Sequence, residues 1–406
     1  MGGTVQPIYF GDSPVAPSSS GSATAPFYAS IGSVLTRYEA DLANASLTAK
    51  QTLDLELDIQ YAWRHPRLPV FYVAISNGGP GKTGDQNRIV VCKIDEASGE
   101  ISVFGPAREL PWRPLHLSLD RENRHLLVAY NNPSGVTVHK VEDDGTLGEA
   151  IPQSDEIDVG IFGHQVMVTP DGDAAILVCR GYDAEDGKDE QPGALKVYGL
   201  KDGVLSPRVS IEPNGGFGFG ARHLDFHPTK PWLFLGIERQ SELQVFELAD
   251  GSVNPDALHS LSTLAGPNKG PARQAMSGIH CHPQGHVVYV SNRAYGTSQS
   301  VLGGEAPEGE DNIAVFSIDP DSGKPTPIQH APTHGHLPRT FSIDASGRML
   351  VAANSEPTTK VTPEGGAREV SLSLVTFKVA ADGTLSEAGV MEFPEKDQRL
   401  FWAGFL

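Results

Sequence analysis

Cysteine is scarce in this sequence. Cys92, Cys179 and Cys281 are far apart in a chain of 406 residues and form no Cys-x-x-Cys pair. So few cysteines exclude a disulfide framework and a thiolate metal site, and they favour a reducing compartment. We therefore expect a cytoplasmic protein.

Positive charge and long apolar runs are also lacking. The chain has 31 Lys and Arg against 50 Asp and Glu, a formal net charge of −19, which argues against nucleic acid and anionic membranes as partners. No apolar stretch approaches the roughly 20 residues of a membrane-spanning helix. Residues 1–26 are rich in Ser, Gly, Pro and Ala and lack the basic start and apolar segment of an export signal. We expect a flexible tail over 1–26 and one folded unit over 27–406.

Long helix-forming stretches are absent too, whereas 44 Gly and 31 Pro indicate many turns. Six segments share one plan, in which two apolar strands joined by a Pro or Asp turn are followed by a polar stretch and a third strand. They begin near Tyr61, Leu117, His164, Arg222, Ile279 and Phe341. Their spacing of about 50 to 60 residues is that of a four-stranded propeller blade with long loops.

The two ends of the chain complement each other. The stretch 27–55 contains three strand-like segments, and "RLFWAGFL" at 399–406 contains one. We therefore predict an all-β protein, a single seven-bladed β-propeller with four-stranded blades, closed by a blade built from both termini. An open β-solenoid is the alternative, but it would leave exposed sheet edges that closure removes.

The repeats can be aligned on the residue that turns from the first strand to the second: Pro66, Arg121, Pro170, Pro228, Pro283 and Ala345. The first strand starts six residues earlier, and the second ends ten residues later. Antiparallel pairing puts both positions at one rim of the central channel. The starts are Gln60, Leu115, His164, Arg222, Ser277 and Arg339, and the ends are Ser76, Asn131, Arg180, Glu238, Arg293 and Ser355.

Ionisable residues at these rim positions come mainly from consecutive middle repeats. Because the strand interiors are apolar, we expect His164, Arg180, Arg222, Glu238, Arg293 and Arg339 to converge on one channel mouth. Four long connections, 78–88, 182–192, 294–311 and 356–368, open on the same rim, either as lids that exclude water or as surface decoration.

These residues carry a resemblance to a known family. With "ARHLDFHPTKPWLFLGIE", "HPQGHVVYVSNRAYG" and "GHLPRTFSIDASGRMLVAAN", the chain from about Phe27 onward resembles the lactonase seven-bladed propellers. That family includes propeller-type 6-phosphogluconolactonases and the fungal 3-carboxy-cis,cis-muconate lactonizing enzyme. The resemblance implies an active site made of His164, Arg222, Glu238 and Arg293. The sequence departs from the family at "FGH", "GARH" and "CRGYD", the last of which introduces Arg180.

Lactone opening needs a proton acceptor, a donor for the developing oxyanion, and a grip on the substrate. Glu238 is expected to stay ionised beside arginines and to activate water, with His164 as the partner acid or base. Arg222 and Arg293 can grip a carboxylate or phosphate. Arg180, Arg339, His336 and Asn292 are further candidates for substrate binding. We expect hydrolysis of a small anionic sugar-acid lactone, phosphorylated or not, without metal or cofactor.

Other interpretations stay open. The same residues suit a lactonizing cycloisomerase that acts on the open-chain acid, and a rim can instead bind a ligand or protein without catalysis. Arg222 and Glu238 can be an inter-blade ion pair. His280 and His282 alternate as a two-histidine metal pair would, but no third ligand is evident. An arginine-rich rim does not suit the calcium of other propeller lactonases. Nothing in the sequence favours a particular oligomeric state.

Overall fold

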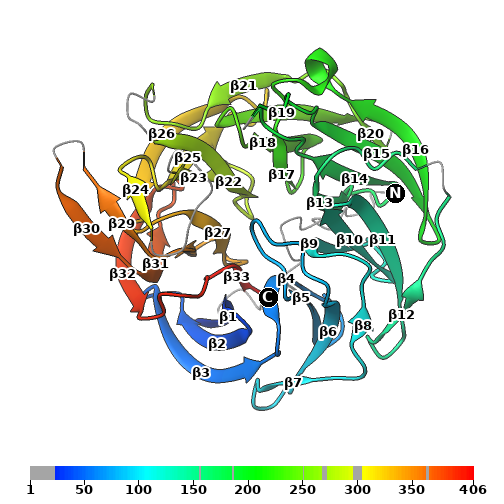
Figure 1. Ribbon diagram of the computed structural model, residues 1–406, viewed down its shortest axis with the longest axis horizontal. Coiled ribbons are helices and arrows are strands. Elements are labelled where there is room, and N and C mark those ends of the chain that lie inside the picture. Colours follow the sequence, from blue (N-terminus) through cyan, green and yellow to red (C-terminus); the bar gives the residue numbers. More distant parts are fainter. Residues whose placement is uncertain are drawn as a thin grey trace, which may run out of the picture.

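The computed structural model describes residues 23–154, 157–184, 187–249, 251–267, 272–295, 304–362 and 365–406. Seven of the sheets that these residues form follow one another as blades around a central axis (Figure 1), which confirms the predicted seven-bladed propeller. They contain one short 3-10 helix, η1 (Pro213–Gly216), and no helix long and apolar enough to cross a membrane. Most of the predicted tail, 1–26, lies outside the described residues, although β1 begins within it at Thr24.

The blades are numbered in chain order. Blade 1 contains β1 (Thr24–Ile31), β2 (Val34–Asp41), β3 (Ser46–Asp54) and β33 (Ala403–Phe405). Blade 2 contains β4 (Asp58–Arg64), β5 (Val70–Ser76), β6 (Asn87–Ile94), β7 (Ile101–Val103) and β8 (Arg108–Glu109). Blade 3 contains β9 (Pro114–Leu119), β10 (His125–Asn131), β11 (Ser134–Val141) and β12 (Leu147–Ala150). Blade 4 contains β13 (Gly163–Val168), β14 (Ala174–Cys179), β15 (Ala194–Lys201) and β16 (Val204–Ile211).

The remaining blades complete the ring. Blade 5 contains β17 (Ala221–Phe226), β18 (Trp232–Ile237), β19 (Glu242–Ala249), β20 (Ser252–Val253) and β21 (His259–Ser262). Blade 6 contains β22 (Arg273–Cys281), β23 (Val287–Tyr295), β25 (Asn312–Ile318) and β26 (Pro325–Pro332). Blade 7 contains β27 (Pro338–Ile343), β28 (Met349–Asn354), β31 (Leu372–Val379) and β32 (Leu385–Phe393).

Blade 1 closes the ring as predicted. β1 pairs with β2 on one side and with β33 on the other, so that Phe27 lies opposite Phe405. Their rings make an edge-to-face contact with centroids 4.9 Å apart. Because β33 is the innermost strand of this sheet, the last strand of the chain also faces the central channel.

The turn between the first two strands is built alike in blades 2 to 7. The residue before each aligned turn position is buried and accepts hydrogen bonds from backbone N–H groups of its own turn: His65, Asp120, Thr169, His227, His282 and Asp344. In blade 6, for example, His282 Nδ1 accepts from Gln284 N at 3.1 Å. His282 Nε2 then lies 3.1 Å from the Gly347 carbonyl oxygen of blade 7, so this histidine also joins two blades.

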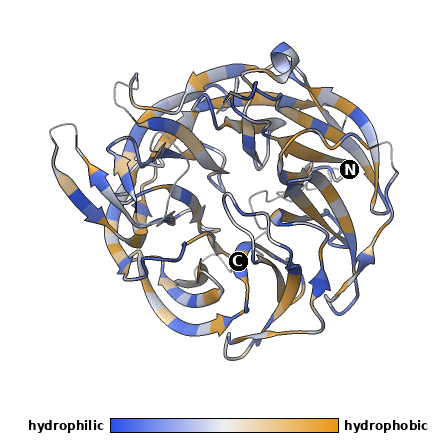
Figure 2. Ribbon diagram, viewed as in Figure 1, coloured by the Kyte–Doolittle hydropathy of each residue, from blue (hydrophilic) through white to orange (hydrophobic). Residues whose placement is uncertain are grey.

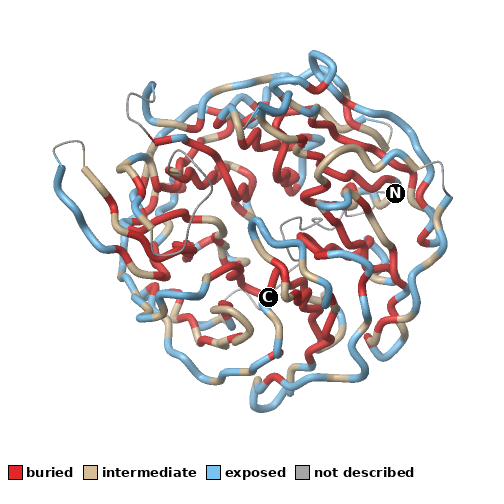
Figure 3. The backbone as a smooth tube through the Cα atoms, viewed as in Figure 1, coloured by how far each residue is buried: buried red, intermediate tan, exposed pale blue. Residues whose placement is uncertain are grey.

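Burial decreases from the channel outward (Figure 3). Every residue of the innermost strand β9 is buried, whereas the outer strand β3 has none buried and alternates between exposed and half-buried positions. Inner strands are covered by neighbouring blades on both faces, so apolar residues run along them without interruption. Apolar and polar residues alternate along the outer strands (Figure 2).

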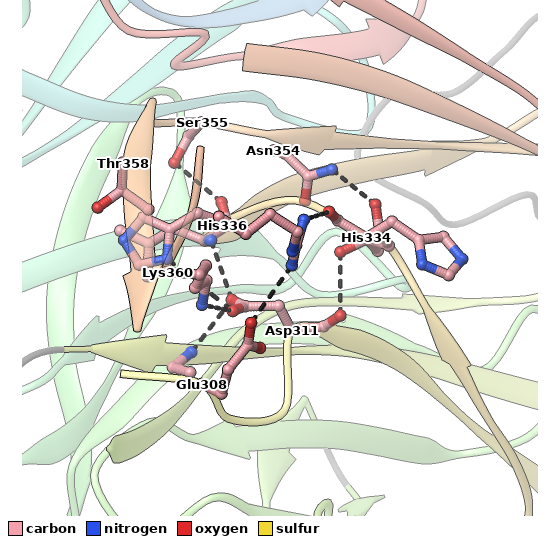
Figure 4. A network of polar contacts seen from close by, with 12 residues as sticks. Glu308, Asp311, His334, His336, Asn354, Ser355, Thr358 and Lys360 are labelled. Atoms are coloured by element: carbon pink, nitrogen blue, oxygen red, sulfur yellow. Dashed lines mark hydrogen bonds and ion pairs between the residues drawn. The ribbon is translucent and has the colours of Figure 1, made fainter. Parts of the chain in front are cut away.

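Two of the long connections join in a small separate sheet. β24 (Glu305–Pro307) pairs with β29 (Thr358–Val361), which pairs with β30 (Ala367–Val370), on the left in Figure 1. The buried ammonium of Lys360 binds the buried carboxylate of Asp311 beneath this sheet (Figure 4). The connections of blades 6 and 7 are therefore locked together beside the channel mouth.

Candidate active site

One cavity of about 490 Å³ opens at the predicted rim. Eight of the twelve aligned rim positions line it: Leu115, Asn131, His164, Arg180, Glu238, Arg293, Arg339 and Ser355. Residues 79–83 and Tyr182 come from two of the long connections, so these connections reach the site. Among the described lining residues, six carry positive side chains and three carry carboxylates. The cavity is therefore cationic in a protein whose overall charge is negative.

β-Bulges explain why these side chains leave the regular pleat. In blade 4, Gly163 pairs with Cys179 and Gln165 with Val178, which leaves His164 as the extra residue. The same shift makes Arg222 the extra residue of β17 and Arg339 that of β27. A bulge re-aims a side chain and ends regular pairing at a sheet end. The aligned strand starts are thus bulge positions.

Glu238 is the centre of a buried charge cluster. Its carboxylate is 3.1 Å from Arg180 Nη1, 3.5 Å from Arg222 Nε, and hydrogen bonded by Arg293 Nη2. Burial alone would raise the pKa of Glu238, but Arg180, Arg293 and Arg222 hold that pKa well below its usual range. Glu238 is ionised at neutral pH, as expected from the sequence. A carboxylate this acidic is, however, a weak proton acceptor.

The Arg222–Glu238 pair corrects one sequence interpretation. Both residues belong to blade 5, so their ion pair lies within one blade rather than between two. The contacts between blades are made by Arg180 of blade 4 and Arg293 of blade 6. Arg222 is 1% exposed. It contacts the carboxylate of Glu238 but does not line the cavity.

His164 is the buried imidazole of the site. Its ring stacks on Phe162 at an interplanar angle of 18° and contacts His223 edge-on, with centroids 4.9 Å apart. Burial, together with the nearby Arg222 and His223, lowers the pKa of His164 well below its ordinary value. The imidazole is therefore neutral at neutral pH, and its Nδ1 has no hydrogen-bond partner among the described residues. The ring lines the cavity, and a neutral imidazole has one unprotonated nitrogen that can accept a proton.

Arg239 holds the connection of blade 4 over the cavity. Its Nη1 donates to the Tyr182 carbonyl oxygen at 2.6 Å, and its guanidinium forms ion pairs with Asp183 at 3.2 Å and Glu190 at 3.1 Å. Arg273 of blade 6 binds the same Asp183. Charge contacts to two neighbouring blades thus fix this part of the cavity wall.

Two predicted substrate contacts lie outside the cavity lining. Asn292 is fully buried, and its amide is occupied by Thr263 and Asn312 at 2.6 to 2.9 Å. His336 faces Asp311, with Nδ1 3.9 Å from Oδ2, in the network around Lys360 (Figure 4). In this structure both residues contact the fold around the site rather than the cavity.

Sequence reasoning missed several lining residues. Arg113, Arg273, Tyr295, Glu356 and Phe401 line the cavity from positions outside the repeat alignment. Arg113 directly precedes β9 and lies two residues before the bulge at Leu115. Its closeness to this aligned rim position is the one feature of the sequence that could have identified Arg113 as a lining residue. Phe401 comes from the segment before β33, where no repeat covers the sequence.

The described residues contain no group of three or more His, Cys, Asp or Glu that could hold a metal ion. His280 contacts Phe341 and lies near Asp225, whereas His282 contacts His286 and belongs to the turn beyond β22. These two histidines therefore do not converge on one point.

Comparisons with known proteins identify the family of the chain. Residues 21–381 match the family model described as "Lactonase, 7-bladed beta-propeller". The 6-phosphogluconolactonase of Bacillus subtilis is 28% identical over 290 residues, 68% of this chain and 72% of that protein. The 6-phosphogluconolactonase of Pectobacterium carotovorum is 28% identical over 317 residues, 77% of this chain and 82% of that protein.

The fold has solved counterparts. The periplasmic gluconolactonase of Pseudomonas aeruginosa superposes with a TM-score of 0.68 at 19% identity, covering 93% of this chain and 98% of that chain. A protein from Lactobacillus plantarum gives 0.68 at 20% identity, with 93% and 98% covered. At these identities the superpositions show the fold, whereas the family match extends over most of the sequence. The chain belongs to the lactonase seven-bladed β-propeller family.

Proposed function

We propose that this protein is a lactonase that opens a small anionic sugar-acid lactone with water, using His164 as the general base. The observation that carries the proposal is the imidazole of His164 in the lining of a cavity that also has six positive side chains. Burial and nearby positive charges lower the pKa of His164 well below its ordinary value, which favours the neutral ring. The family match and the 6-phosphogluconolactonases among the relatives support this reaction. A cavity of about 490 Å³ suits a substrate of this size.

The reaction follows from what each group can do. His164 takes a proton from water as the water oxygen adds to the lactone carbonyl carbon. The negative charge that develops on the carbonyl oxygen is stabilised by N–H groups of Arg180 and Arg293. When the tetrahedral intermediate collapses, the ring C–O bond breaks and the departing ring oxygen takes the proton back from His164. The product is the open-chain hydroxy acid, which releases a proton at neutral pH.

Glu238 has a supporting role in this scheme. Its carboxylate is too acidic to take a proton from water efficiently, but it contacts all three arginines of its cluster. We assign it the task of holding Arg180 and Arg293 beside the reacting carbonyl. This departs from the sequence-based expectation, in which Glu238 itself activated water.

Proton release measured in a pH-stat tests the proposal. The panel is 6-phosphogluconolactone, unphosphorylated sugar lactones and carboxymuconolactone, each corrected for spontaneous hydrolysis. We expect accelerated acid release from at least one anionic lactone, and a loss of about 100-fold or more in kcat for His164→Gln. His259→Gln, on the outer strand β21, is the matched control. A flat response across the panel overturns the proposal, and formation of lactone from the open-chain acid would assign the reverse, lactonizing reaction.

We also propose a cytoplasmic location. The three cysteines are buried and unpaired, which supports a reducing compartment. Cell fractionation of the native host tests this assignment.

A further inference from the structure

Two arginines flank one aromatic ring in the wall of the cavity. Arg113 enters from the start of blade 3 and Arg339 from the bulge of blade 7, and Phe401 comes from the segment that leads into blade 1. Their guanidinium carbons lie 5.5 Å and 4.1 Å from the centroid of the Phe401 ring. The Glu238 cluster comes from blades 4, 5 and 6, so the two groups occupy different arcs of the ring.

Neither guanidinium forms a direct ion pair with a carboxylate of the described residues, although Asp58 acts on Arg113, and Glu238 and Glu356 act on Arg339, from a longer distance. Arg113 Nε donates to the neutral amide oxygen of Gln60 at 2.8 Å, and the side chain of Arg339 forms no ion pair within the described ranges. Glu356, a carboxylate of the cavity lining, accepts from Arg399 Nε at 2.8 Å. Two positive side chains thus line the cavity, and their direct contacts among the described residues are a ring and an amide.

The pKa values of both guanidinium groups are lowered, which reflects the cost of burying these charges close together. Burial, followed by the nearby Arg339 and Arg399, lowers the pKa of Arg113 to about 9. Burial, followed by Arg293, lowers the pKa of Arg339 to about 10. Both side chains still carry their charge at neutral pH. Bringing like charges together in a buried place is unfavourable unless an anion joins them.

We propose that Arg113, Arg339 and Phe401 form a second oxyanion-binding subsite, which holds the acidic group of the substrate remote from its reacting carbonyl. The role rests on the lactonase function proposed above, but the binding of an anion does not. Guanidinium groups offer paired N–H donors to phosphate and carboxylate alike, and Phe401 keeps their planes in place by stacking. His164 and the Glu238 cluster then meet the carbonyl at the other end of the same molecule.

Isothermal titration with inorganic phosphate, and separately with acetate, tests the subsite in the absence of catalysis. We expect wild-type protein to bind at least one of the two anions. Arg113→Gln and Arg339→Gln should each weaken that binding at least tenfold, with Arg113→Lys retaining part of it. The control is Arg88→Gln, whose partner Glu109 lies 2.7 Å away in blade 2, outside the cavity lining. A tighter response to phosphate or to acetate identifies the preferred oxyanion.

Kinetics then separate this inference from the proposed function. With an anionic lactone, Arg113→Gln should raise KM at least tenfold and change kcat less, and the rise in KM should be smaller for a neutral lactone. Binding of neither anion by the wild type, or equal binding by wild type and both Gln variants, overturns the subsite whether or not the protein is a lactonase. Anion binding lost in the variants of a protein that opens no lactone supports the subsite and overturns the function instead. Thermal melting of each variant verifies that it is folded.

Discussion

At the scale of single residues, the site depends on a contrast between two buried groups. Glu238 is kept charged by three arginines, whereas His164 is kept neutral by burial and by some of the same positive charges. The cationic environment lowers the pKa of both groups, so that at neutral pH the carboxylate is charged and the imidazole is neutral. The proposed mechanism therefore assigns Glu238 a different role from the one expected from the sequence, because residue types reveal which groups can titrate but not how their surroundings shift them.

The pH dependence of catalysis follows from the state of His164. In the proposed mechanism the neutral imidazole is the active form, and its pKa lies well below the ordinary histidine value. We expect kcat/KM to stay level between about pH 6.5 and 8 and to fall only on the acid side of the ordinary histidine pKa. Initial rates across pH, corrected for spontaneous hydrolysis, measure this profile. An acid limb centred at or above pH 6.5 would contradict the assignment.

Replacing Glu238 tests its supporting role. Glu238→Gln leaves Arg180, Arg222 and Arg293 without their shared carboxylate. We expect the free energy of unfolding in urea to fall by about 3 to 5 kcal/mol, the usual cost of breaking a buried ion pair. Glu109→Gln, which breaks an exposed pair with Arg88, should cost about 0 to 1 kcal/mol. Equal losses in the two variants would mean that the buried cluster contributes no more than a surface pair.

At the scale of elements, the turn histidines join neighbouring blades and are tuned to stay neutral. Burial is the main cause that lowers the pKa of His227 and of His282 to about 4. The Nδ1 of each accepts backbone N–H groups, which a protonated ring cannot do. In the unfolded chain these rings take up protons near pH 6.5, before the folded protein does. Stability is therefore lost as pH falls from about 6.5 to 4.

The variant His282→Asn tests this loss of stability at the contact between blades 6 and 7. Asn keeps an acceptor for the turn, as Asp344 does in the next blade, but it carries no titrating ring. We expect the unfolding free energy of the variant to depend less steeply on pH between 6.5 and 4 than that of the wild type. Urea unfolding at a series of pH values measures both slopes, and identical slopes would refute the role of this histidine.

Elements also show how far the sequence could predict the site. The repeat alignment identified the bulge residues His164, Arg222 and Arg339, because bulge and turn recur at a constant separation in each blade. It missed Arg113 and Phe401, since neither occupies a repeated position. Asn292 and His336, which were also expected to bind substrate, have other contacts in this structure. They lie next to rim positions in sequence, but the buried contacts that occupy them depend on neighbouring strands and loops.

At the scale of the whole molecule, stability depends on how well β33 closes the ring. Phe405 is 5% exposed and packs on Phe27 across the junction of the two ends. We expect Phe405→Ala to lower the unfolding free energy by about 3 to 5 kcal/mol, as removal of a buried aromatic side chain does. Val390→Ala, on the outer strand β32 and 45% exposed, is the control and should change it little. Similar losses of unfolding free energy in the two variants would show that the contact of Phe405 with Phe27 contributes no more to stability than an exposed side chain does.

The closure by β33 has a consequence for protein synthesis. Strands β1 to β3 leave the ribosome first, but the partner that completes their sheet is made some 370 residues later. Phe401, which belongs to the cavity wall, is made at the same late stage. A nascent chain can therefore fold its middle blades while its first sheet still has an open edge and its cavity lacks a wall. Catalytic activity in such a protein reports that translation has reached the final strand and that the two ends have met.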